Sequence, residues 1–218
     1  MEIFCLLIVF GPLVAALLVG LWGESVGNKG AHWISNVGVA ASFILSCYVF
    51  LRLSYGGEPT FNKNIYTWLE AGGIQFHIGF LVDQLTAVMM VVVTFVSWMV
   101  HIYTIGYMAD DPGYQRFFSY ISLFTFSMLM LVMSNNFIQL FFGWEAVGLV
   151  SYLLIGFWYH KDSAVSASLK AFLVNRVGDF GFLLGIAGIL MYFGTLDYHA
   201  VFAASSSISE KEISLIPG

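Results

Sequence analysis

The chain has 218 residues, of which 59% are hydrophobic and only 10% charged, and its formal net charge is -5. This composition is far more apolar than that of a soluble globular domain and predicts a membrane protein. The sequence has no basic patch that would favour a nucleic-acid partner, and its two cysteines, Cys5 and Cys47, lack the spacing of a zinc or iron-sulfur ligand set.

Apolar segments of membrane-spanning length follow one another along the chain, separated by Gly, Pro, Asn and charged residues. They predict an all-α membrane protein, a polytopic transmembrane bundle with about six helices near residues 3–22, 32–53, 80–106, 117–134, 137–158 and 171–193. The first segment lacks the basic start of a signal peptide, so we interpret it as a retained helix. Residues 54–79 are expected to form an outer loop, and residues 195–218 a polar tail.

The basic residues of the connecting segments indicate an orientation. With the N-terminus outside, more of them fall on the inner side, and cytoplasmic loops are enriched in Lys and Arg. The pattern therefore favours an outer N-terminus. The inner residues would be Lys29, Arg116, Lys161, Lys170 and Arg176, and the outer ones Arg52, Lys63 and Lys211.

Two titratable residues of the third segment, Asp83 and His101, lie 18 residues apart, which is five turns of a helix. Hydroxyl-bearing residues lie between them on the same face and could hold water in the interior of a bundle. Histidine titrates near neutrality, which suits proton transfer. In the alternative interpretation Asp83 caps the helix, His101 is interfacial and the hydroxyls bond to their own backbone.

The fifth segment, "FFGWEAVGLVSYLLIGFW", carries a single carboxylate, Glu145. Gly148 and Gly156 lie on the same helical face, so we expect this face to contact protein rather than lipid. A carboxylate at the centre of a membrane costs roughly 2.5–3.5 kcal/mol on insertion scales, which favours a functional role. Burial would favour its protonated form and a nearby cation its ionised form. The alternative is a neutral carboxyl that only stabilises helix packing.

The sixth segment has a polar face with Asn175, Arg176 and Asp179, and its Arg and Asp are spaced to pair. Lys170 points away from this face, and both basic residues could instead reach the headgroups. On the opposite side, a strip formed by Gly181, Gly185 and Gly188 predicts helix packing.

Catalytic motifs of other classes are missing from the sequence. It contains no nucleotide-binding glycine motif, nucleophile elbow or HExxH sequence. A membrane hydrolase is therefore poorly supported.

Three stretches carry a family resemblance: "GYQRFFSYISLF" (113–124), "LFFGWEAVGLVSYLLIGFWY" (140–159) and "KAFLVNRVGDFGF" (170–182). They resemble the N-terminal part of subunit L of bacterial NADH-quinone oxidoreductase, the complex I subunit related to Mrp-type antiporters. The resemblance implies that Glu145 is the buried charge of a proton channel, that Arg176 and Asp179 are supporting charges, and, more weakly, that Lys170 belongs to the site. It places three N-terminal helices in residues 1–110 and the start of the antiporter-like repeat in residues 111–194.

Members of that family continue through further helices, one of which is interrupted and carries the lysine that pairs with the glutamate. We therefore expect a truncation point within residues 195–218 and no independent proton transport by this chain. The resemblance implies a multi-pass protein of the bacterial inner membrane that takes part in an oxidoreductase as a proton-translocating subunit. Its partners would be other complex I membrane subunits, lipid and protons.

We expect no cofactor in this chain, whereas the parent complex would use NADH, FMN, iron-sulfur clusters and quinone. Two alternatives stay open. One is a subunit of an Mrp-type cation/proton antiporter or a membrane-bound hydrogenase, which a sodium requirement would help to distinguish. The other is a non-catalytic membrane scaffold whose polar residues only specify helix packing.

Overall fold

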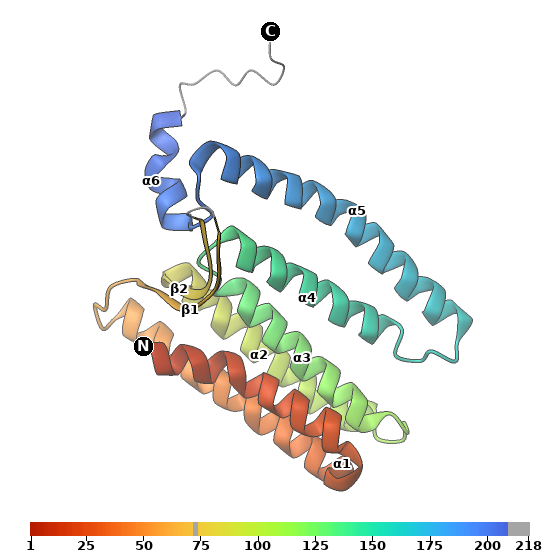
Figure 1. The fold of residues 1–218 in the computed structure, drawn as a ribbon. Helices are drawn as coiled ribbons and strands as arrows, with labels where there is room; N and C mark the ends of the chain where they lie inside the picture. The colour runs from red at the N-terminus through yellow and green to blue at the C-terminus, as the bar shows by residue number, and fades with distance from the viewer. Residues whose placement is uncertain (72–73, 209–218) are drawn as a thin grey trace.

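The computed structural model describes residues 1–71 and 74–208 and shows a helical bundle with a β-hairpin across one end (Figure 1). Helices α1 to α5 are each long and apolar enough to cross a membrane, which confirms the predicted polytopic bundle. The elements in chain order are α1 (Glu2–Ser54), β1 (Phe61–Ala71), β2 (Ile74–Val82), α2 (Gln84–Tyr107), α3 (Tyr114–Val132), α4 (Phe137–Ile155), α5 (Asp162–Phe193) and α6 (Tyr198–Ile208).

Helix α1 turns back on itself and supplies two antiparallel segments, so the first two predicted helices both lie within it (Figure 1). The turn contains Gly27 with a φ of 69°, a conformation that residues with a Cβ atom rarely adopt. Beyond the turn the two halves pack closely, and the Ser42 hydroxyl donates a 2.9 Å hydrogen bond to the Ile8 carbonyl. The described part of the chain therefore has six membrane-length segments.

The connection expected near residues 54–79 is not an irregular loop for most of its length, because β1 and β2 form an antiparallel hairpin there. The expectation rested on polarity, whereas the β-branched and aromatic residues of these strands favour extended backbone. Phe80 and Val82 are buried in the core as part of β2. The third helix consequently begins at Gln84 rather than at residue 80, and Asp83 is its N-cap.

Helix α5 begins at Asp162, well before the predicted start at residue 171, and runs for 32 residues. The prediction placed the start where the sequence becomes apolar. However, the Ala, Ser and Leu residues before residue 171 are also compatible with a helix, and an acidic residue in the first turn is favourable. The first part of the expected polar tail forms α6, while Lys211 and the rest of residues 209–218 lie outside the described residues.

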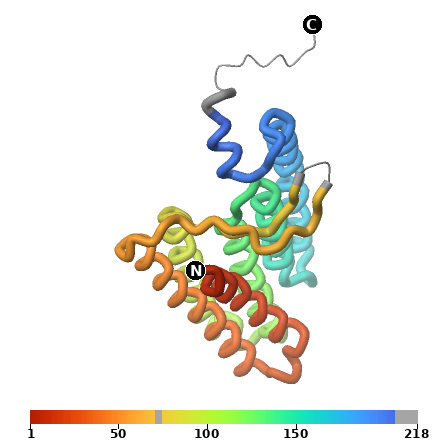
Figure 2. Tube along the Cα trace, turned by 60° about the vertical axis from the view of Figure 1, so that its left-hand side comes forward, coloured from red at the N-terminus to blue at the C-terminus, as the bar shows by residue number. Residues whose placement is uncertain are grey.

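Two clusters of buried apolar side chains hold the bundle together, and both are centred on α1, α2 and α3. One lies beneath the hairpin and includes Phe80, Met90 and Met133. The other lies at the opposite end and includes Val19, Met108 and Phe118. Helix α5 lies at the edge of the bundle against α4 (Figure 2). Only 11% of its most apolar 18-residue stretch is buried.

The connections between helices gather at two ends of the bundle. At the loop end, which comprises the α1 turn and the α2–α3 and α4–α5 connections, Gln115 donates to Asn28 at 2.7 Å and Trp158 to Asp111 at 2.9 Å. The hairpin end carries the N-terminus, the hairpin, and the α3–α4 and α5–α6 connections (Figure 1). This alternation is what consecutive membrane crossings require.

Candidate functional site

The candidate site lies between the middle parts of α4 and α5. Helix α4 begins after Asn136, whose side chain accepts a hydrogen bond from the backbone N–H of Gln139 at 2.8 Å. From this fixed start, Glu145 falls near the middle of the 19-residue helix. Arg176 and Asp179 are three residues apart and lie deep within α5, because that helix begins at Asp162. Arg176 therefore lies near the middle of its helix, and not close to the helix start as the predicted bounds implied.

Arg176 lies between the two carboxylates. Its Nη1 atom forms an ion pair with Oε2 of Glu145 and lies 3.7 Å from Oδ2 of Asp179. The guanidinium also lies over the Phe172 ring, 4.6 Å from its centroid. The predicted pairing of Arg176 with Asp179 is thus present, and the structure adds Glu145 to it.

Trp144 also contacts this cluster, and this contact was not predicted from the sequence. Its indole N–H donates a 2.8 Å hydrogen bond to Oδ1 of Asp179. The Asp179 side chain is only 7% exposed, compared with 42% for Arg176. Asp179 is therefore held by Trp144 and almost fully enclosed, whereas the arginine is more exposed. The sign of this contact in the sequence was that Trp144 directly precedes Glu145 in the "GWE" string.

Glu145 has unused hydrogen-bonding capacity. Its side chain is 18% exposed, and its Oε1 atom is buried without a hydrogen-bond partner among the described residues. Two carboxylates and one guanidinium leave the ionised cluster with one excess negative charge. A proton on either carboxylate would make the cluster neutral, so these side chains form a chemically reasonable proton-exchange site.

The glycines near the cluster differ from the prediction. A Cβ at Gly156 would lie 3.0 Å from the Ser168 hydroxyl, so α5 does approach α4 there, whereas Gly148 has no such neighbour within 4 Å. The prediction that the strip of glycines on α5 packs against a helix does not hold within residues 1–71 and 74–208. Its members, Gly181, Gly185 and Gly188, would meet nothing within 4 Å.

Lys170 is separate from the cluster. It is exposed on α5, six residues before Arg176, and forms no ion pair with another described residue. Asn175 is also exposed. Four residues were the main predictions for the proton path. The structure brings three of them together, Glu145, Arg176 and Asp179, and leaves Lys170 apart.

Asp83 and His101 take different roles from the predicted row. The Asp83 carboxylate accepts a 2.7 Å hydrogen bond from the Thr86 backbone N–H and so caps α2. The Thr94 hydroxyl donates to the Met90 carbonyl of its own helix at 2.7 Å. These contacts are those of the alternative interpretation, in which helix capping and backbone bonds explain the polar residues.

His101, in contrast, is fully buried within the bundle. Its Nε2 atom lies 3.0 Å from the Ser122 hydroxyl of α3, and its Nδ1 atom lies 2.8 Å from the Ser97 carbonyl. The Ser97 hydroxyl in turn lies 2.5 Å from that of Thr125. The polar contacts of His101 thus cross from α2 to α3 instead of following α2 toward Asp83.

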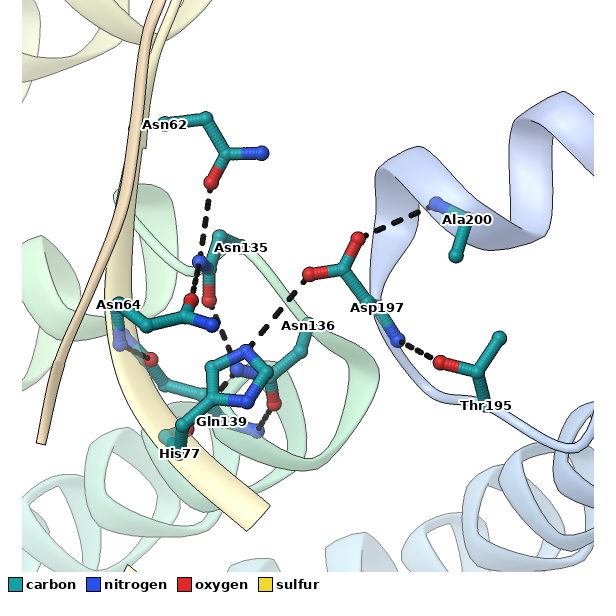
Figure 3. Close-up of polar contacts among 10 residues, drawn as sticks. Asn62, Asn64, His77, Asn135, Asn136, Gln139, Thr195, Asp197 and Ala200 are labelled. Carbon is teal, nitrogen blue, oxygen red and sulfur yellow. Dashed lines mark hydrogen bonds and ion pairs between the residues drawn. The ribbon is translucent and has the colours of Figure 1, made fainter. Parts of the chain in front are cut away.

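A second polar cluster at the hairpin end was not predicted (Figure 3). We call it the hairpin junction; it consists of His77, Asn135, Asn136, Gln139 and Asp197. These residues come from β2, the α3–α4 connection, α4 and the α5–α6 connection, so sequence spacing gave no sign that they meet. In the described part of the chain, no group of three or more His, Cys, Asp or Glu residues is placed to hold a metal ion.

Two family models match the chain. Residues 68–118 match the model described as NADH-Ubiquinone oxidoreductase (complex I), chain 5 N-terminus. Residues 134–217 match the model described as NADH:quinone oxidoreductase/Mrp antiporter, TM. The two matches together cover more than half of the chain, and the second one contains Glu145, Arg176 and Asp179.

Curated relatives align with nearly the whole chain. NADH-quinone oxidoreductase subunit L of Neisseria meningitidis is 62% identical over 215 residues, which is 98% of this chain and 32% of the relative. NADH-ubiquinone oxidoreductase chain 5 of Marchantia polymorpha is 46% identical over 205 residues, 94% of this chain and 30% of the relative. The chain thus spans about a third of the length of these relatives.

Solved structures share the fold. A membrane-bound sulfane sulfur reductase, an archaeal respiratory membrane complex, has a chain that matches with a TM-score of 0.79 at 19% identity, over 96% of this chain and 41% of that one. A chain of the Mrp complex from a Dietzia species matches with a TM-score of 0.78 at 20% identity, over 94% and 21%. The family models and the curated relatives show that the chain belongs to the NADH:quinone oxidoreductase/Mrp antiporter family of membrane subunits, with high similarity to subunit L.

Proposed function

We propose that the chain forms part of a proton-translocating, antiporter-like membrane subunit of NADH-quinone oxidoreductase, in which Glu145 exchanges the proton. One observation carries this proposal: Arg176 lies between Glu145 and Asp179 in the middle of two neighbouring membrane helices. Charged groups at this depth are costly, so a cluster of three calls for a functional explanation. Similarity to subunit L suggests NADH-quinone oxidoreductase as the complex in which the cluster would act.

The cluster supports a specific mechanism of proton exchange. With Arg176 against Glu145, the glutamate is stabilised as a carboxylate. If Arg176 moves toward Asp179, Glu145 loses its cation and its affinity for a proton rises. When Arg176 returns, the proton is released. Trp144 fixes Asp179 by its hydrogen bond, so the longer and more exposed arginine is the group that moves.

The energy for this movement would come from redox chemistry in other subunits. We assign NADH, FMN, iron-sulfur clusters and quinone to the parent complex, because this sequence has no nucleotide-binding glycine motif and only two cysteines. In this proposal the protein lies in the bacterial inner membrane beside other complex I membrane subunits. The hairpin end, with the N-terminus, faces outward and the more basic loop end faces inward.

The test is the Glu145→Gln variant in the full-length subunit within the assembled complex. Glutamine keeps the size of the side chain but cannot take up and release a proton. We expect NADH oxidation by quinone to persist and the number of protons moved per electron to fall. Glu24→Gln is the matched control, because Glu24 is an exposed carboxylate in the α1 turn. Proton uptake into sealed vesicles and NADH absorbance are measured together.

Other outcomes point to the alternatives. Full proton-to-electron coupling in Glu145→Gln would remove this residue from the mechanism. Unchanged coupling with a reduced amount of assembled complex would favour a scaffold whose polar residues specify packing. Transport that requires sodium would favour an Mrp-type cation/proton antiporter, whose fold the chain shares.

A further inference from the structure

The hairpin junction contains a buried histidine whose ring lacks ordinary hydrogen bonds. His77 on β2 is 7% exposed, and neither ring nitrogen has a hydrogen-bond partner among the described residues. Its Nε2 atom lies 3.7 Å from Oδ2 of Asp197, on the α5–α6 connection, as Figure 3 shows. This distance permits charge attraction but is too long for a hydrogen bond.

The other polar side chains of the junction are well bonded. Asn135 donates to the side chains of Asn62 and Asn64 on β1 at 3.1 and 2.7 Å (Figure 3). Asn136 donates to the His77 carbonyl at 3.1 Å and to the Asn135 side chain at 2.9 Å. A buried polar group without a partner is costly within such a network. We therefore expect the stability of the hairpin junction to depend on whether the His77 ring is protonated.

Few charges face the ring. The strand residue opposite His77 is Thr67, and Gln139 from α4 is also neutral. Tyr198 follows Asp197, but burial raises the pKa of its hydroxyl, so it stays uncharged near neutral pH. Lys63 and Glu70, further along β1, contact Glu2 and Gln75 respectively. Asp197 is therefore the one described carboxylate that acts closely on the ring.

Apolar surroundings complete the setting. The ring borders a cavity of about 350 Å³ whose wall is mostly apolar and includes Trp68, Met130 and Phe142. Such a wall favours the neutral form of histidine. Burial lowers the pKa of His77 below the usual histidine value, and the Asp197 carboxylate opposes this effect in part.

We propose that His77 is a second protonation site, separate from the Glu145 cluster, which leaves the β-hairpin packed against the helices while the ring is neutral and loosens it when the ring is protonated. A proton on the ring would place a charge in a buried, apolar setting without hydrogen bonds, and the Asp197 carboxylate at 3.7 Å offsets this cost only in part. Two backbone contacts would respond directly. The Gly79 N–H donates to the Gln139 side chain at 2.9 Å, and the Leu81 N–H donates to the Met133 carbonyl at 3.0 Å. Both join β2 to the helices beneath it.

The direction of the pH effect follows from the burial of the His77 ring without hydrogen bonds, which lowers the pKa of His77. The docked hairpin binds a proton less tightly than the undocked hairpin, whose histidine has an ordinary pKa of about 6.5. Docking is therefore strongest above that pH and weakens as the pH falls below it. On the side of the membrane that receives protons, acidification would loosen the hairpin.

The test follows deuterium exchange of the Gly79 and Leu81 amides in the full-length subunit within its complex. At each pH the rate is divided by that of His77→Phe, which keeps a ring but cannot be protonated, so the intrinsic pH dependence of exchange cancels. Between about pH 7.5 and about pH 5.5 we expect this ratio to rise several-fold. His199→Gln is the matched control, because His199 is exposed on α6 and should leave the rise unchanged.

A second variant keeps the test decisive if His77→Phe disturbs folding. Asp197 accepts a 3.2 Å hydrogen bond from the Ala200 N–H, and Asn can accept the same bond. Asp197→Asn removes the charge that stabilises protonated His77, so acid should loosen the hairpin more strongly than in the native protein. A ratio that does not change with pH, or an Asp197→Asn variant less sensitive to acid, would overturn the proposal.

Discussion

The indole N–H of Trp144 donates a 2.8 Å hydrogen bond to Asp179, so α4 holds in place one of the two carboxylates that share Arg176. The other carboxylate, Glu145, belongs to the next residue of the same helix. Helix α4 thus carries one carboxylate that competes for Arg176, Glu145, and holds the other, Asp179, in position. Predictions about proton exchange can therefore also be tested by variants of Trp144 and Arg176.

Replacing Trp144 by Phe should weaken coupled proton transport. Phenylalanine keeps an aromatic ring beside Phe182 but cannot donate to Asp179, which would then compete more strongly for Arg176. We expect fewer protons per electron, with assembly and NADH oxidation retained. Proton uptake in vesicles provides the measurement. Trp158→Phe is the control, because its N–H contacts Asp111 at the loop end, away from the cluster.

Arg176→Gln should leave Glu145 without its cation. An acid without a partner in an apolar environment favours the protonated form. Infrared spectroscopy should then show an additional protonated carboxyl band at neutral pH that disappears in the double variant with Glu145→Gln. Lys170→Gln, on the same helix but exposed, should give no such band. A spectrum unchanged by Arg176→Gln would contradict the arrangement in which Arg176 stabilises the carboxylate.

Gly143→Ala should destabilise the contact between α3 and α4. A Cβ atom at this position would lie 2.7 Å from the Leu131 Cα atom, so the backbones must move apart. Overpacking of this kind costs about 1–3 kcal/mol. We expect a lower melting temperature of the purified subunit in detergent. Gly148→Ala is the matched control on the same helix, because its Cβ would meet nothing within 4 Å and should not lower the melting temperature.

His101→Leu should also destabilise the bundle. Leucine fits an apolar site but leaves the Ser122 hydroxyl without its 3.0 Å contact to the ring. A buried polar group without a partner costs about 1–3 kcal/mol. Thermal unfolding should reveal the loss, whereas His160→Leu, at an exposed position in the α4–α5 connection, should have little effect. Equal melting temperatures for both variants would mean that the His101 contacts add no stability.

The sequence by itself determined the membrane bundle and most of the charged site. Apolar length predicts spanning helices whatever their neighbours are, because an isolated helix satisfies its own backbone hydrogen bonds in lipid. The position of Glu145 within such a segment, and the spacing of Arg176 and Asp179, are likewise local properties. These features were therefore available without coordinates.

The tertiary structure decided which helices meet. Only the packing of α5 against α4 places Arg176 beside Glu145 and Trp144 beside Asp179. The glycine strip of α5 shows the converse, since its spacing suggested packing but no described residue covers it. The hairpin junction brings His77 to Asp197 across 120 positions of the chain. Contacts between residues so distant depend on the path of the backbone through space, which no local pattern of residues encodes.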